Sequence, residues 1–134
     1  MPPDQGTARR VLIAERDRNV RDLQSYALQA AGFVVAFAED GEAALADATS
    51  QPTALVVTEI LIPKLDGLTL CRRLRADHAT CAVPVLVFSI LSAAARAEEA
   101  GASAFLRKPF IESTFIATVS LLTTPTEPTM TDTQ

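Results

Sequence analysis

The stretch ALVVTEILIPKLDGLTLCRRLRAD, residues 54–77, contains the pattern that decides the fold of this chain. It opens with an apolar run that ends at Thr58 and continues through a loop that holds Pro63 and the pair Asp66-Gly67. Apolar side chains then recur at helical spacing from Leu68. A short apolar run bounded by turn residues is typical of a strand that is buried on both faces. The stretch therefore predicts a buried strand, a loop and a helix in that order.

The same unit recurs on both sides of this stretch. Short apolar runs that alternate with helical patterns indicate βαβ units, right-handed crossovers and a parallel sheet covered by helices on both faces. Asn19 is the predicted N-cap of the first helix, which ends before Gly32. The predicted strands are 11–14, 33–37, 54–58, 85–88 and 104–106, and the other predicted helices are 40–49, 68–74, 92–100 and 112–122.

Length and composition indicate one globular domain. The chain has 134 residues, of which 49% are hydrophobic and 21% are charged, and a single core can stabilise a chain of this size. We expect the domain to span residues 9–122. Residues 1–8 are expected to be flexible, and the Thr/Pro-rich tail 123–134 is expected to be disordered.

Charge and cysteine content exclude several classes of function. The net charge of -4 argues against nucleic-acid or membrane partners, which require a basic face. Cys71, Cys81 and His78 lack metal-ligand spacing, so we expect two reduced thiols and no metal site.

The chain has no glycine-rich phosphate-binding motif, which argues against a nucleotide enzyme. We expect a cytoplasmic protein because no apolar leader or membrane-spanning run is found.

Polar side chains follow four of the predicted strands at the point where each strand ends. Glu15 and Arg16 follow the first strand, Glu59 the third, Ser89 the fourth and Lys108 the fifth. The carboxyl ends of parallel strands meet at one edge of a sheet, where such folds place their binding crevice. We therefore expect these five side chains to share one site.

The chain resembles two-component response-regulator receiver domains over roughly residues 10–122. The resemblance rests on VLIAERDRNVRDL, GFVVAFAEDGEAAL, the stretch quoted first, VPVLVFS and EAGASAFLRKPF. It implies a flavodoxin-like, doubly wound α/β fold with a five-stranded parallel sheet in the order 2-1-3-4-5.

The resemblance also implies a role for each residue at the strand ends. In the family, two adjacent acids hold Mg²⁺, an aspartate accepts the phosphoryl group, and a Ser/Thr and a lysine bind the phosphoryl oxygens. Residue by residue, the acid pair falls on Glu15 and Arg16, and the phosphoacceptor falls on Glu59. The phosphate contacts fall on Ser89 and Lys108. The switch aromatic falls on Phe105.

Two of these positions depart from the family pattern. Arg16 offers no lone pair to a metal ion and repels it, so we expect Mg²⁺ binding to be lost or weak and no other cofactor. Glu59 is one methylene longer than aspartate, and a small displacement of a reacting group can cost about 10²-fold in rate. We expect Arg16 to replace the metal in a closed, neutral cluster of Glu15, Arg16, Glu59 and Lys108. In the alternative, Arg16 points to solvent; a shift that brings Asp17 into the metal site is disfavoured.

These residues predict a stand-alone pseudo-receiver, which is a binding module and not an enzyme. It would act by protein–protein interaction in phosphorelay-type signalling, independently of aspartyl phosphorylation. The partner would be a histidine kinase, an effector or another regulator. The alternative is a receiver that is phosphorylated at Glu59 and dephosphorylates itself. The surface formed by 92–100, 104–106 and 112–122 is the expected contact face, and the chain is expected to be a monomer or a dimer through that face.

Overall fold

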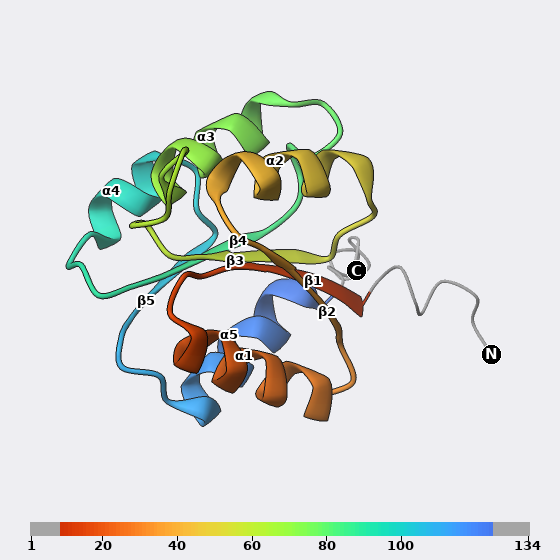
Figure 1. Cartoon of the computed structure of the whole chain (residues 1–134), viewed down its shortest axis with the longest axis vertical. Helices are drawn as coiled ribbons and strands as arrows, with labels where there is room; N and C mark the ends of the chain where they lie inside the picture. Colours follow the sequence, from red (N-terminus) through yellow and green to blue (C-terminus); the bar gives the residue numbers. More distant parts are fainter. Residues whose placement is uncertain (1–8, 125–134) are drawn as a thin grey trace, which may run out of the picture.

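The computed structural model describes residues 9–124, which form one parallel sheet between two layers of helices. Helices α1 and α5 cover one face of the sheet, and α2, α3 and α4 cover the other (Figure 1). The strands are β1 (Arg10–Ala14), β2 (Val34–Ala38), β3 (Leu55–Thr58), β4 (Val85–Ser89) and β5 (Ala104–Arg107). The helices are α1 (Arg18–Ala30), α2 (Gly41–Ser50), α3 (Gly67–Ala76), α4 (Ala94–Glu99) and α5 (Glu112–Thr123).

The strand order is β2-β1-β3-β4-β5, and every neighbouring pair is parallel. This confirms the predicted doubly wound α/β fold of the flavodoxin type. The register pairs Ala14 with Thr58 and Ser89 with Arg107. The residues that follow these strands therefore emerge side by side at one edge of the sheet.

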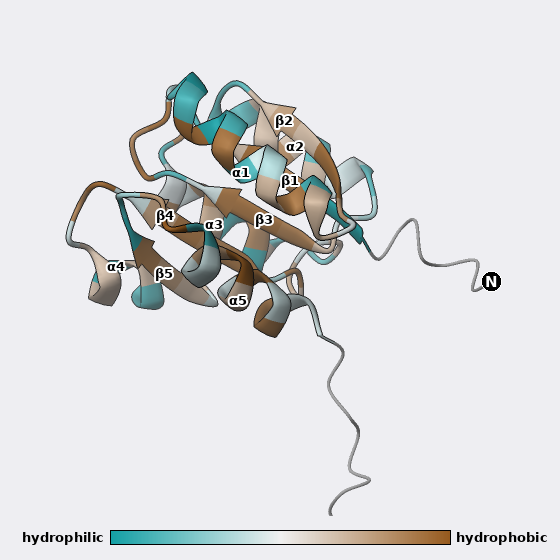
Figure 2. Ribbon diagram, turned by 90° about the horizontal axis from the view of Figure 1, so that it is seen from below, coloured by the Kyte–Doolittle hydropathy of each residue, from teal (hydrophilic) through white to brown (hydrophobic). Residues whose placement is uncertain are grey.

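Alternating side chains of the strands supply two hydrophobic cores. Leu12 and Val56 belong to the core under α2, α3 and α4, whereas Val11 and Ile13 belong to the core under α1 and α5. Successive side chains of a strand point to opposite faces, so a strand covered on both sides must be apolar throughout. Figure 2 shows this in the hydrophobic colouring of β3 and β4.

The predicted elements exist, and their ends differ by a few residues. The N-cap of α1 is Asp17 and not Asn19, because the Asp17 carboxylate accepts hydrogen bonds from the backbone N–H groups of Asn19 and Val20. Helix α5 extends to Thr123, so the predicted tail begins too early. The expectations for residues 1–8 and 125–134 lie outside the described residues.

The two cysteines lie in different surroundings. Cys71 is buried, Cys81 is exposed, and both are free.

The Asp66-Gly67 pair starts α3, with Asp66 as its N-cap. Gly67 is required by close packing, because a Cβ there would lie 2.3 Å from the backbone oxygen of Glu59. None of the helices within residues 9–124 is long and apolar enough to cross a membrane.

Candidate functional site

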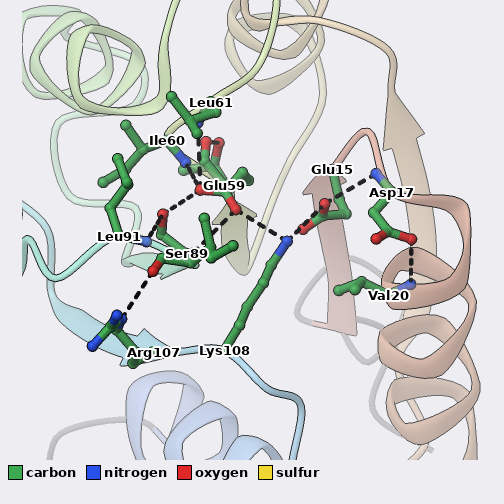
Figure 3. A network of polar contacts seen from close by, with 12 residues as sticks. Glu15, Asp17, Val20, Glu59, Ile60, Leu61, Ser89, Leu91, Arg107 and Lys108 are labelled. Carbon is green, nitrogen blue, oxygen red and sulfur yellow. Dashed lines mark hydrogen bonds and ion pairs between the residues drawn. The ribbon is translucent and has the colours of Figure 1, made fainter.

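The site lies where the chain leaves β1, β3, β4 and β5, and Lys108 stands at its centre (Figure 3). The Nζ atom of Lys108 lies 3.1 Å from Glu15 Oε2 and 3.0 Å from Glu59 Oε2. Both glutamates are only 4% exposed. One lysine that follows β5 therefore joins two buried carboxylates that follow β1 and β3.

Glu59 is held by hydrogen bonds from three segments. Its Oε1 accepts from the hydroxyl of Ser89 and from the backbone N–H groups of Ile60, at 2.6 Å, and Leu61, at 3.3 Å. Its Oε2 faces Lys108 and accepts a longer bond of 3.4 Å from the Ile90 N–H. A carboxylate with this many donors is fixed in position and stabilised in its charged form.

The loop between β4 and α4 is tied to the same cluster. The Leu91 N–H donates to Ser89 Oγ at 3.1 Å, and the Lys108 N–H donates to the Ser89 carbonyl at 2.8 Å. Arg107 donates to the Ile90 carbonyl at 2.9 Å and to the Ser92 hydroxyl at 3.2 Å. Sequence reasoning missed Arg107, although its place at the end of β5, directly before Lys108, was a usable signal.

The expected place of Arg16 in the cluster is wrong. Arg16 is exposed, and within residues 9–124 it forms no ion pair. The chain bends at Arg16, directly after Glu15. Glu15 is buried in the cluster, whereas the Arg16 side chain is exposed at the rim of the pocket. The buried cluster of Glu15, Glu59 and Lys108 therefore has a net charge of -1 and is not neutral.

The surroundings shift the pKa values of the two glutamates in opposite directions. Burial is the main cause that raises the pKa of Glu15 above its usual range. The hydrogen bonds from the Asp17 N–H and from Lys108 act in the opposite direction but do not outweigh burial. Burial also acts upward on the pKa of Glu59, but the bonds from Ser89, Lys108 and Ile60 outweigh it and lower that pKa. Burial would lower the pKa of Lys108, yet the two glutamates raise it.

Glu15 differs from Glu59 in how its oxygens are used. Its Oε2 accepts from the Asp17 N–H at 3.1 Å and from Lys108. Its Oε1 is buried and has no hydrogen-bond partner. Leaving a buried acceptor unpaired costs about 1–3 kcal/mol, and more when the group is charged.

The described residues show no complete set of protein ligands for Mg²⁺. Octahedral Mg²⁺ needs converging oxygen ligands at ~2.0–2.1 Å. Among the described residues, no group of three His, Cys, Asp or Glu side chains could hold a metal ion. An arginine occupies the second position of the acid pair, and Lys108 already takes one oxygen of Glu15. The oxygens instead line an open pocket of about 350 Å³, whose walls are Glu15, Arg16, Asp17, Glu59, Leu61 and Lys108.

Phe105 lies outside this cluster. It is half-buried, packs against the core under α4, and lines a groove of about 370 Å³ between α4 and β5. Helix α4 itself is only six residues long. The structure thus brings Glu15, Glu59, Ser89 and Lys108 together and places Arg16 at the rim of the pocket and Phe105 on a separate face.

Comparison with known proteins identifies the family. The family model described as "Response regulator receiver domain" matches residues 11–120. The chain is 35% identical over 116 residues to the DNA-binding dual master transcriptional regulator RpaA of Synechocystis sp., with 84% of this chain and 48% of RpaA covered. It is 32% identical over 110 residues to the alkaline phosphatase synthesis transcriptional regulatory protein PhoP of Bacillus subtilis, with 76% of this chain and 43% of PhoP covered.

Solved structures agree with this assignment. The signal receiver domain of a signal transduction histidine kinase from Syntrophus aciditrophicus matches with a TM-score of 0.80 and 26% identity, covering 89% of this chain and 95% of that one. The chemotaxis response regulator CheY4 of Vibrio cholerae matches with a TM-score of 0.79 and 25% identity, covering 84% and 97%. The chain spans about half the length of the curated relatives named above. With its fold, its strand-end site and these matches in agreement, the chain belongs to the response regulator receiver family.

Proposed function

We propose that this receiver domain signals by protein–protein contact, without Mg²⁺-dependent phosphorylation of a carboxylate. The observation that carries the proposal is the bonding of Glu59, which stands at the phosphoacceptor position. Its carboxylate already bonds to Ser89 and Lys108, the two side chains that the family resemblance assigns to the phosphoryl oxygens. The groups expected to bind a phosphoryl group are therefore already bonded to a carboxylate of the chain itself.

The alternative, a phosphorylatable Glu59, is supported less well. Transfer of a phosphoryl group requires an in-line approach and neutralisation of its charge. Both oxygens of Glu59 are tied to donors, and its pKa is lowered, which makes the carboxylate a weaker nucleophile. The exposed Arg16 supplies no metal ligand.

The class of partner follows from the family. Receiver domains exchange signals with kinases and effectors, and we place this chain in the cytoplasm as a binding module and not an enzyme, without nucleic acid as a direct ligand. Its expected contact face consists of α4, β5 and α5, where the groove beside Phe105 lies. Because α4 has only six residues, this face differs from one built on a longer helix.

The proposal is tested with a small phosphodonor. The full chain and the variants Arg16→Asp, Glu59→Asp and Arg16→Asp/Glu59→Asp are incubated with acetyl phosphate and Mg²⁺, and their intact masses are measured. We expect the natural chain to remain unmodified and the double variant to gain one phosphoryl group. The double variant restores both carboxylates of the family pattern and therefore serves as the positive control. A phosphoryl group on the natural chain would overturn the proposal.

A further inference from the structure

The pocket beside Lys108 carries negative charge that no described contact neutralises. Glu15 lines this pocket, is 4% exposed, and leaves its Oε1 without a partner. Asp17 and Glu59 line the same pocket. Against these three carboxylates stand Lys108, which is engaged by two of them, and Arg16, which is exposed and unpaired within residues 9–124.

The shape of the pocket favours a cation larger than a metal ion. Glu15 and Glu59 already converge on Lys108 Nζ, and no group of three metal-holding side chains is found within residues 9–124. The pocket that they line together with Asp17 has a volume of about 350 Å³. A guanidinium group carries five N–H donors in a planar fork and can bond to several separated acceptors at once. It is also more weakly hydrated than an ammonium group, so it enters such a site at lower cost.

The neighbouring surface is apolar. Leu61, in the loop after β3, is 50% exposed and lines the pocket itself. Ile90, in the loop after β4, is 57% exposed, and its N–H bonds to the Glu59 carboxylate. Aliphatic side chains of a partner can therefore pack beside the charged pocket.

We propose that this edge of the sheet is a docking surface for an arginine of a partner protein, whose guanidinium enters the pocket beside Glu15 while flanking aliphatic residues pack on Leu61 and Ile90. The guanidinium places N–H donors beside the Glu15 carboxylate, which lines the pocket and is 4% exposed, and it cancels the net charge of the pocket. The inference deepens the proposed function, since it names the chemistry of the partner that the site recognises.

A titration of the full ¹⁵N-labelled chain tests the docking surface. The probe is the peptide N-acetyl-Leu-Arg-Leu-amide, and its matched control replaces arginine with citrulline, which keeps the shape and removes the charge. We expect saturable amide shifts at residues 15–17 and 59–61 with the arginine peptide. The affinity should be at least tenfold lower for the citrulline peptide and for the variant Glu15→Gln.

Further variants separate the rival occupants. Glu42→Gln removes an exposed carboxylate on α2 and should leave the affinity unchanged. Arg16→Ala tests whether the chain's own Arg16 fills the pocket; binding that occurs only in this variant would overturn the proposal. A titration with Mg²⁺ alone that gives the same shifts at lower concentration than the peptide would also overturn it.

The peptide titration and the phosphodonor experiment can fail independently of each other. Equal binding of both peptides, or unchanged binding by Glu15→Gln, would reject the arginine site while the phosphodonor experiment could still show no modification. Conversely, a phosphorylated natural chain would reject the proposed function even if the arginine peptide bound as expected.

Discussion

At the scale of single residues, the site depends on one lysine shared by two glutamates in different surroundings. Glu59 has hydrogen-bond donors for both oxygens, whereas Glu15 keeps one buried oxygen unpaired. Burial therefore raises the pKa of Glu15, whereas for Glu59 burial is outweighed by the hydrogen bonds taken together, which lower the pKa. The two glutamates should contribute to stability with opposite dependence on pH.

The first prediction concerns this opposite dependence. A raised pKa means that the folded state binds more protons than the unfolded state, so the contribution of Glu15 falls as pH rises from about 4 towards neutrality. The free energy of unfolding of the natural chain minus that of Glu15→Gln should decrease over this range. The same difference for Glu59→Gln should increase as pH rises towards about 4, because a lowered pKa gives a contribution that is complete above the ordinary glutamate pKa and is lost as pH falls below it. Urea unfolding at several pH values measures both differences, and equal signs would contradict the assignment.

At the scale of elements, the helices differ in whether a side chain accepts hydrogen bonds from their first backbone N–H groups. Asp66 accepts hydrogen bonds from the N–H groups of Leu68 and Thr69, both at 2.9 Å, and from the Thr69 hydroxyl at 2.8 Å. Helix α4 starts at Ala94, and its N-cap residue Ala93 supplies no side-chain hydrogen bond. The start of α3 also packs against the backbone of Glu59 through Gly67. The cap of α3 therefore supports the loop that carries Glu59.

The second prediction tests this cap. Asp66→Ala should lower the free energy of unfolding by about 1 kcal/mol, since it leaves N–H groups at the start of α3 without their acceptor. Asp22→Ala, which removes an exposed carboxylate in the middle of α1, is the matched control and should stay within about 0.5 kcal/mol of the natural chain. Chemical denaturation measures both. Equal losses in the two variants would show that the Asp66 cap contributes nothing specific.

At the scale of the whole molecule, the topology assembles the site from distant parts of the sequence. The order β2-β1-β3-β4-β5 places β1, β3 and β4 side by side, so Glu15, Glu59 and Ser89 become neighbours at one edge of the sheet. Lys108, after the outer strand β5, reaches across to the residue that follows β1. Any ligand that binds there stabilises the folded domain as a whole.

The third prediction uses this linkage with Mg²⁺. A ligand at 100 times its dissociation constant stabilises the folded state by about 2.7 kcal/mol. The unfolding midpoint of the natural chain should be insensitive to Mg²⁺, because Arg16 supplies no ligand. The variant Arg16→Asp/Glu59→Asp should become more stable as Mg²⁺ is added. Thermal melts with Mg²⁺ and with EDTA measure this, and a Mg²⁺-dependent midpoint in the natural chain would contradict the prediction.

Much of the fold could be predicted from local patterns. Apolar runs such as 54–58 and 85–88 identify strands that are buried on both faces, because only a continuous run can supply two cores at once. The order of strands and helices then favours a doubly wound sheet. This sheet accounts for the meeting of Glu15, Glu59, Ser89 and Lys108, since parallel strands end at the same edge.

The tertiary structure decided the direction and bonding of individual side chains. Arg16 lies outside the cluster, Asp17 and not Asn19 caps α1, and Arg107 ties down the loop after β4. Residue type and spacing determine which element forms and roughly where it ends. The course of the backbone after each strand, and the competition among neighbouring donors for each carboxylate oxygen, exist only once the elements have packed. The sequence by itself thus determined which chemical groups meet at this edge of the sheet, and only the packed structure decided which of their atoms are bonded and which remain free.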